Sequence, residues 1–172
     1  MSDFDAVALF EAMDAQRIAR GLSWREAANQ IWDLSAELNE RRRDHPISAS
    51  TLTGIAKRRD TTCQHALFIL RWLGVAPEQF VPGIRRDGGD ALPRAGPNQR
   101  LRWNLKALYD ALNTRRVEQG LSWPALAADL RCTAHQLKGI RTARFAIGMR
   151  LAMRIVQWLD RPASTYVYAA EW

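Results

Sequence analysis

Residues Leu9–Trp24 read LFEAMDAQRIARGLSW, and residues Leu108–Trp123 read LYDALNTRRVEQGLSW. A second match follows each copy: Ala66–Val81 reads ALFILRWLGVAPEQFV, and Ala152–Val167 reads AMRIVQWLDRPASTYV. An internal repeat constrains the architecture before any residue chemistry is considered. The repeated unit spans about 70–80 residues, which is too long for a solenoid repeat and suits a small complete domain. We therefore expect two related domains.

The composition is that of a folded protein outside the membrane. Of the 172 residues, 47% are hydrophobic and seven are Trp, which is enough apolar material to bury cores. No run of about 18 apolar residues occurs, so we expect no membrane span. The first residues, MSDFDAVALFEAMDAQ, are acidic and lack the basic stretch that opens a secretory signal. The expected location is the cytoplasm.

The cysteine and histidine residues show no pattern for chemistry. Cys63 and Cys132 form no CxxC motif, and His45, His65 and His135 lie far apart in the chain. We interpret both cysteines as reduced, structural thiols of a cytosolic protein. Neither a metal ion nor another cofactor is expected. No nucleophile elbow, phosphate-binding loop or carboxylate pair is evident either, so we do not expect an enzyme.

The positive charge is unevenly distributed along the chain. The formal net charge is +7 and the pI is about 10.2. Residues 1–81 hold 10 basic and 11 acidic residues, residues 82–100 hold 4 and 2, and residues 101–172 hold 11 and 5. A basic balance suits a polyanionic partner. The second repeat unit should therefore attract phosphate more strongly than the first.

Helical periodicity and turn residues divide each unit into short helices. Apolar residues recur at helical spacing, and no convincing strand alternation appears, so the expected fold class is all-α. Gly21 and Gly120 are expected to end the first helix of each unit. Residues 82–100 hold three Pro and four Gly and are predicted to be a linker between domains 1–81 and 101–172. The expected N-caps of later helices are Ser23, Ser48, Ser122 and Thr133.

The first unit carries an insertion of about fourteen residues, around Trp32 to His45, that the second unit lacks. This segment is expected to extend the second helix through Leu38 and to end in the basic run Arg41, Arg42 and Arg43. Two interpretations stay open. The run is either an arm that reaches a phosphate backbone or a solvated loop.

The repeated motifs resemble the Cro and lambda-repressor type of helix-turn-helix protein, the XRE family. RGLSWREAA and QGLSWPALA are similar to the junction between its first two helices, STLTGIAKR and HQLKGIRTAR to its third helix, and RWLGVAPEQF and QWLDRPASTY to its closing segment. The resemblance covers both units except the linker and the insertion. It implies two tandem repressor-like domains of four to five helices each.

In that family the third helix enters the DNA major groove. The resemblance therefore implies base reading by the more polar second unit, where Gln136 can pair with adenine and Lys138 with guanine. It also places Arg25 beside a phosphate at the start of the second helix. The DNA-contacting residues implied for the third helices are Ser48, Ser50, Thr53, Lys57, Arg58 and Arg59 in the first unit and Thr133, His135, Gln136, Lys138, Arg141 and Arg144 in the second.

One departure concerns the turn before the third helix, which in the family usually contains Gly. Here the second unit has Leu130, Arg131 and Cys132, and the first unit has the insertion. A non-Gly residue in a left-handed turn costs on the order of 1 kcal/mol, so we expect a remodelled turn.

Two functions follow as hypotheses. The first is a nucleoid-associated transcriptional regulator, expected to be a repressor, whose two units bind a bipartite, asymmetric site on double-stranded DNA. A 19-residue linker spans roughly 24 Å, comparable with a half-site spacing of about 34 Å. The alternative is that one unit, more readily the first, is a protein-interaction or homodimerisation module and only the other binds DNA.

Overall fold

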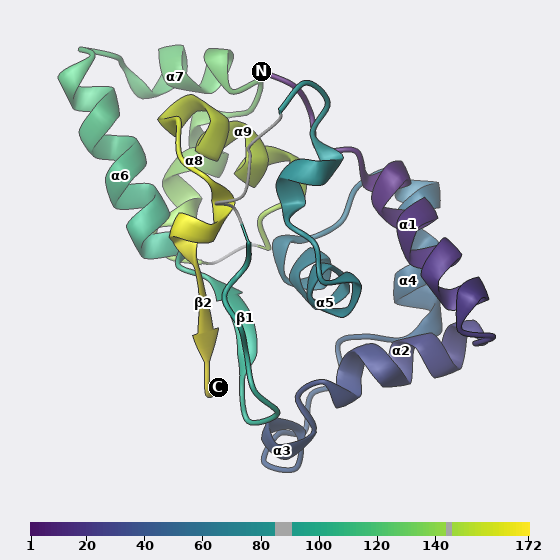
Figure 1. The fold of residues 1–172 in the computed structure, drawn as a ribbon. Coiled ribbons are helices and arrows are strands. Elements are labelled where there is room, and N and C mark those ends of the chain that lie inside the picture. The colour runs from purple at the N-terminus through teal and green to yellow at the C-terminus, as the bar shows by residue number, and fades with distance from the viewer. Residues whose placement is uncertain (85–90, 144–145) are drawn as a thin grey trace.

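The computed structural model describes residues 1–84, 91–143 and 146–172, which are mostly helical with one small two-stranded sheet (Figure 1). The first half contains the helices α1 (Ala6–Ala19), α2 (Trp24–Asp33), α3 (Ala36–Asn39), α4 (Ala49–Arg58) and α5 (Cys63–Leu73), followed by the 3-10 helix η1 (Pro77–Phe80). The second half contains the strand β1 (Arg100–Trp103), the helices α6 (Leu105–Glu118), α7 (Trp123–Asp129), α8 (Ala134–Ile140) and α9 (Met149–Leu159), the 3-10 helix η2 (Ala163–Tyr166) and the strand β2 (Val167–Ala170).

The helix ends follow the expected residues. The Ser23 hydroxyl accepts from the Glu26 N–H at 3.2 Å, and the Glu26 carboxylate accepts from the Ser23 N–H at 2.7 Å, which completes a capping box. Gly21 and Gly120 both have a φ of 64° in the turns after α1 and α6, where a Cβ would be strained. The predicted N-caps are confirmed at all four positions: Ser23, Ser48, Ser122 and Thr133.

The all-α prediction is wrong in one place, because β1 and β2 form an antiparallel pair. Leu101 lies opposite Ala169, and Trp103 lies opposite Val167. Each strand has four residues, and β1 opens with two consecutive buried residues, so no alternation marks it in the sequence. The sheet joins the end of the chain to the segment that leads into α6.

The insertion of the first half does not extend α2 through Leu38 as expected. The helix ends at Asp33, and α3 is a separate single turn. Between them, the buried Ser35 hydroxyl donates to the Gln99 carbonyl at 2.6 Å and accepts from the Arg71 guanidinium at 2.8 Å. Ser35 thus bonds to tertiary partners, and this competition interrupts the helix.

The two halves pack against each other through one continuous hydrophobic core. Thr62 and Gly148, the N-caps of α5 and α9, form an antiparallel β-bridge. The residue after each one donates its N–H to the carbonyl that precedes the other, at 2.9 Å for Cys63 and 2.8 Å for Met149. We call this junction, residues 59–63 and 147–150, the seam.

The segment that leads into α1, residues 1–5, packs on the second half. The Asp3 carboxylate accepts from the Arg154 guanidinium at 2.8 and 3.0 Å. The Ser2 backbone donates to the Gln157 side chain at 3.0 Å and accepts from it at 2.8 Å. We call residues 1–5 the first lead-in segment.

The segment that leads into α6, residues 95–104, packs in turn on the first half, and we call it the second lead-in segment. The Arg71 guanidinium donates to its carbonyls at 2.9 Å (Ala95), 3.0 Å (Gly96) and 3.0 Å (Gln99). Arg100 is 1% exposed, with its guanidinium carbon 4.5 Å from the centre of the Trp32 ring. The part of the predicted linker from residue 95 onward is therefore fixed to the first half.

Candidate nucleic-acid interface

Two helices at equivalent positions of the repeat expose the residues predicted to contact DNA. α4 packs on α1 and α2, and α8 packs on α6 and α7. Leu52 and Ile55 are buried under α4, and Leu137 and Ile140 under α8, so the opposite face of each helix meets solvent. The exposed predicted residues are Arg25, Arg41, Arg43, Ser48, Ser50, Thr53, Lys57, Arg58, Arg59, Thr133, His135, Gln136, Lys138 and Arg141. Arg42 is half-buried, and Arg144 lies outside the described residues.

The first two turns of α4 expose small side chains bonded to their own helix, and its last turn exposes Lys57 and Arg58. The Ser48 hydroxyl accepts from the Thr51 N–H at 3.2 Å, and the Thr53 hydroxyl donates to a backbone carbonyl one turn earlier at 3.1 Å. The Arg58 guanidinium lies where a Cβ on Gly54 would sit. Such a face allows close approach to a partner but offers few groups to base edges.

The exposed face of α8 carries longer polar side chains. The Thr133 hydroxyl accepts from the Gln136 N–H at 3.1 Å, and the Gln136 side-chain oxygen accepts from the Thr133 N–H at 2.9 Å, a capping box that was not expected. In the adenine pair that the family resemblance implies for Gln136, this oxygen would accept from the base, so such a pair would compete with the capping box. Lys138, one residue before Gly139, projects from the exposed side of the helix.

The turn between α7 and α8 keeps a left-handed residue even though it lacks Gly, so the expected remodelling is not found. Arg131 has a φ of 52°, and the Cys132 N–H donates to the Ala127 carbonyl at 2.9 Å. The Arg154 guanidinium donates to the carbonyls of Leu130 at 3.2 Å and Arg131 at 3.1 Å. These bonds offset the cost of the left-handed backbone and hold the turn in place.

The basic run of the insertion is partly occupied within the protein. Arg42 lies 2.7 Å from the Asp44 carboxylate, which also accepts from the buried Arg100 at 3.0 Å. Hydrogen bonds from Arg42 and then Arg100 hold the pKa of Asp44 well below its usual range. The insertion thus receives the second lead-in segment, while Arg41 and Arg43 remain exposed beside α3, at the lower edge of Figure 1.

The tryptophans at the start of α2 and α7 wedge these helices against their neighbours. Trp24 stacks on Phe10 with ring centres 5.3 Å apart, and Trp123 stacks on Tyr109 at 5.6 Å. Arg25, the neighbour of Trp24, is exposed at the first turn of α2. This geometry supports a structural role for both tryptophans and leaves Arg25 accessible.

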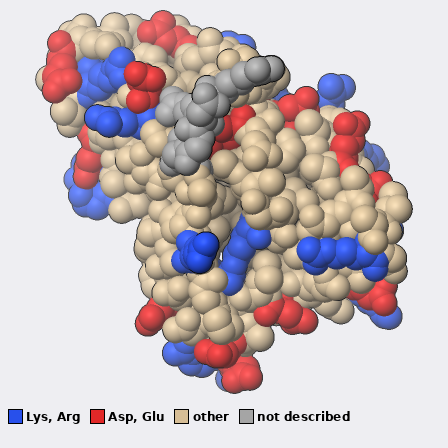
Figure 2. Space-filling model, viewed as in Figure 1, with Lys and Arg blue, Asp and Glu red and all other residues tan. Residues whose placement is uncertain are grey.

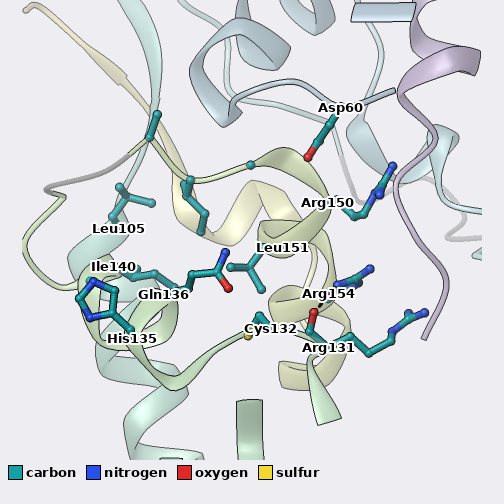
Figure 3. Close-up of a pocket in the computed structure, with 14 residues that line it drawn as sticks. Asp60, Leu105, Arg131, Cys132, His135, Gln136, Ile140, Arg150, Leu151 and Arg154 are labelled. Atoms are coloured by element: carbon teal, nitrogen blue, oxygen red, sulfur yellow. Dashed lines mark hydrogen bonds between the residues drawn. The ribbon is translucent and has the colours of Figure 1, made fainter. Parts of the chain in front are cut away.

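A cavity of about 530 Å³ lies at the seam between α8 and α9 (Figure 3). Asp60 of the first half and Gln136 of the second line it together. Arg131, Arg150 and Arg154 form its border, and Figure 3 shows their guanidinium groups directed away from α8. Sequence reasoning missed these arginines as a group, and the only signal was the helical i, i+4 spacing of Arg150 and Arg154.

On the face shown in Figure 2, acidic and basic side chains are interspersed and form no single basic patch. No helix among the described residues has the length and apolarity needed to cross a bilayer. The same residues contain no group of three or more His, Cys, Asp or Glu placed to hold a metal ion.

Comparison with known proteins identifies no relative of this chain. No family profile, curated protein or solved structure matched it.

Proposed function

We propose that this chain is a DNA-binding protein built from two tandem helix-turn-helix units, with α2 and α4 as the helix pair of the first unit and α7 and α8 as that of the second. The observation that supports it best is the pair of equivalent, solvent-facing helices α4 and α8, each packed on the helix before it. A helix-turn-helix protein places such a second helix in the major groove.

Within that class, we propose a sequence-specific transcriptional regulator, a repressor, that binds an asymmetric site on double-stranded DNA. The two exposed faces differ in chemistry: α4 has Ser50 and Thr53 where α8 has His135 and Lys138. Different side chains at equivalent reading positions favour different base pairs. A palindromic site presents the same base pairs to both units, whereas two units with different reading residues favour an asymmetric site.

The charge distribution indicates that the two units contribute unequally to DNA affinity. The second unit, residues 101–172, has 11 basic and 5 acidic residues, and its exposed Lys138 and Arg141 flank the α8 surface. Phosphate contacts by such residues supply affinity that falls with salt concentration. The second unit is therefore the principal reader, and the first unit adds contacts through Lys57 and Arg59.

The test is selection of bound DNA from a random pool, followed by salt-titrated binding of variants to the selected site. Lys138→Ala with Arg141→Ala should lower affinity at least tenfold and reduce the slope of log affinity against log salt by about 1–2. Arg161→Ala is the control for loss of a positive charge, because this exposed arginine follows α9 and belongs to neither α4 nor α8. No enrichment of any sequence would overturn the proposal.

A second candidate function is favoured by the α4 surface. Its small, internally bonded side chains and the near-balanced charge of residues 1–81 also fit a unit that binds a protein or a second copy of this chain. In that case Lys57→Ala with Arg59→Ala leaves DNA affinity unchanged while the Lys138 and Arg141 variant loses it. Equal losses from both variants would exclude this candidate.

A further inference from the structure

We propose that this protein accepts only one spacing between its two DNA half-sites, and that Asp3 and Arg154 are positioning residues that set this spacing. The inference rests on the proposed function and goes beyond it, since tandem DNA-binding units joined by a flexible linker would tolerate several spacings. The question is whether α4 and α8 can move relative to each other.

The first restraint is the seam, into which both helices lead. α4 ends at Arg58, and four residues later Thr62 pairs with Gly148, directly before α9. The Arg150 guanidinium donates to the Arg59 carbonyl at 2.7 Å, which adds a bond from α9 to the end of α4. Because the path from α4 to the second half is this short, rotation of α4 against α9 would break these bonds.

The second restraint is the Arg154 guanidinium, which joins three parts of the chain at once. Its Nε and one terminal nitrogen donate to the Asp3 carboxylate at 2.8 and 3.0 Å, in a two-pronged geometry. Its other terminal nitrogen donates to the two carbonyls of the turn that precedes α8. The Arg154 side chain is 11% exposed and the Asp3 side chain 38%, so the guanidinium is largely shielded from water while the carboxylate stays partly accessible to it.

Asp3 transmits this link to α4 through α1. Two residues after Asp3, the Asp5 side chain caps α1 by accepting from the Val7 and Ala8 N–H groups at 3.0 Å. Phe4, between the two acids, is 1% exposed and anchors the segment in the core. α1 in turn packs along α4. Asp3 also pairs with Arg131 of the turn before α8, at 3.0 Å. Arg154 and Arg131 thus connect that turn to the segment before α1, the helix on which α4 packs.

If the two helices are fixed in this way, the affinity for DNA should depend strongly on the spacing between the half-sites. Each base pair inserted between two half-sites moves them apart by about 3.4 Å and rotates one by about 35° around the duplex axis. A rigid pair of helices cannot follow either change. Insertion of ten base pairs, a full turn of the duplex, restores the relative rotation of the two half-sites but moves them farther apart by about 34 Å.

The experiment uses the full chain and duplexes that carry the selected site with one or two base pairs deleted, or with one, two or ten inserted, between the half-sites. Binding is measured by fluorescence anisotropy at one salt concentration. The wild type should lose at least tenfold in affinity with one or two added or removed base pairs, and the ten-base-pair insertion should not restore it.

Variants at Asp3 assign the spacing to the proposed residues. Asp3→Ala should narrow the ratio of affinities between the selected and altered spacings at least threefold, whereas Asp3→Glu, which keeps a carboxylate, should preserve most of it. Asp110→Ala removes an exposed ion pair within α6 and is the control.

Each outcome separates the two proposals. Equal binding at all spacings by the wild type overturns the fixed spacing and leaves the proposed function standing. An unchanged spacing profile in Asp3→Ala overturns the role of Asp3 and Arg154. Absence of binding at every spacing, including the selected one, overturns the proposed function itself.

Discussion

Arg71 and Gln157 occupy equivalent positions on α5 and α9, and each binds the segment that leads into the other half of the protein. Arg71 donates to carbonyls of the second lead-in segment, at 2.9 Å for Ala95, and Gln157 donates to the Ser2 carbonyl of the first at 2.8 Å. A single helix position has thus kept one task in both copies of the repeat with two different side chains. The exchange of lead-in segments joins the halves outside their core, in addition to the seam.

Arg71→Ala should lower the free energy of unfolding by about 2–3 kcal/mol, because it leaves carbonyl groups without the charged donor that satisfied them. The affected acceptors include the Leu34 carbonyl, bound at 2.7 Å, as well as those of the second lead-in segment. Urea denaturation followed by tryptophan fluorescence measures the change. Arg94→Ala, at an exposed position nearby, should change stability by less than about 0.5 kcal/mol. Similar losses for both variants would refute the role of Arg71.

Asp44 gives the protein an acid-sensitive contact. Its pKa is lowered in the folded state by hydrogen bonds from Arg42 and Arg100, so its contribution to stability is present above the ordinary aspartate pKa of about 3.9 and is lost as the pH falls below it. Its side chain is 40% exposed, which reduces the gain to about 1–2 kcal/mol. Asp44→Asn should be less stable than the wild type at pH 7, and the gap should begin to narrow at about pH 4 and shrink further as the pH falls toward the lowered folded-state pKa of Asp44. A gap that is constant with pH would contradict this account.

The seam can be tested by a crosslink. Thr62 and Gly148 form a bridge pair without direct mutual hydrogen bonds, for which the Cα separation is about 4.5 Å, within the range of a disulfide. A Cβ at Gly148 would lie 3.2 Å from the Asp60 carboxylate, which has to shift slightly to admit it. Thr62→Cys with Gly148→Cys should then oxidise and should be about 2–4 kcal/mol more stable oxidised than reduced. Because the seam is proposed to stay closed on DNA, both forms should bind the selected site equally.

Mass spectrometry and gel mobility identify the crosslinked form. The natural Cys63 is a minor competitor, because burial raises its pKa far above that of an ordinary thiol. Loss of DNA binding on oxidation alone, with recovery on reduction, would show that the seam has to open.

Gly54→Ala should stabilise the protein by about 0.5–1 kcal/mol while weakening its contact with DNA. Gly54 lies inside α4, and the atoms a new Cβ would meet belong to the flexible end of Arg58, which can move. Thermal unfolding measures the first effect and anisotropy the second. A loss of stability would mean that Arg58 is fixed over Gly54, and an unchanged DNA affinity would favour a role for α4 in protein binding.

Much of the helical scaffold is predictable from local sequence signals. Capping residues such as Ser23 and Thr133 and the glycine turns at Gly21 and Gly120 depend on neighbours a few residues away, so the sequence contains the whole cause. The exposure of the two predicted reading faces also follows from the spacing of buried residues such as Leu52 and Ile55.

The contacts between the halves could not be predicted in this way. Ser35 interrupts a helix only because Arg71 and Gln99 reach it from distant parts of the chain. Arg100 belongs to a Gly- and Pro-rich stretch typical of a linker, yet it is buried against Trp32 because the insertion supplies Asp44 as its partner. Composition predicts the conformation that a segment prefers in isolation. In the folded protein, partners from distant parts of the chain determine the conformation of these segments.

Because the lead-in segments are exchanged, each half of the chain supplies contacts that the other half needs to cover its surface. A fragment that stops at residue 84 lacks the strand and carbonyl groups that cover α5, and a fragment that starts at residue 91 lacks the acid that binds Arg154. Neither fragment can complete its own surface, although the two together can. The two halves of the chain therefore form one interdependent structure, in which each half completes the surface of the other.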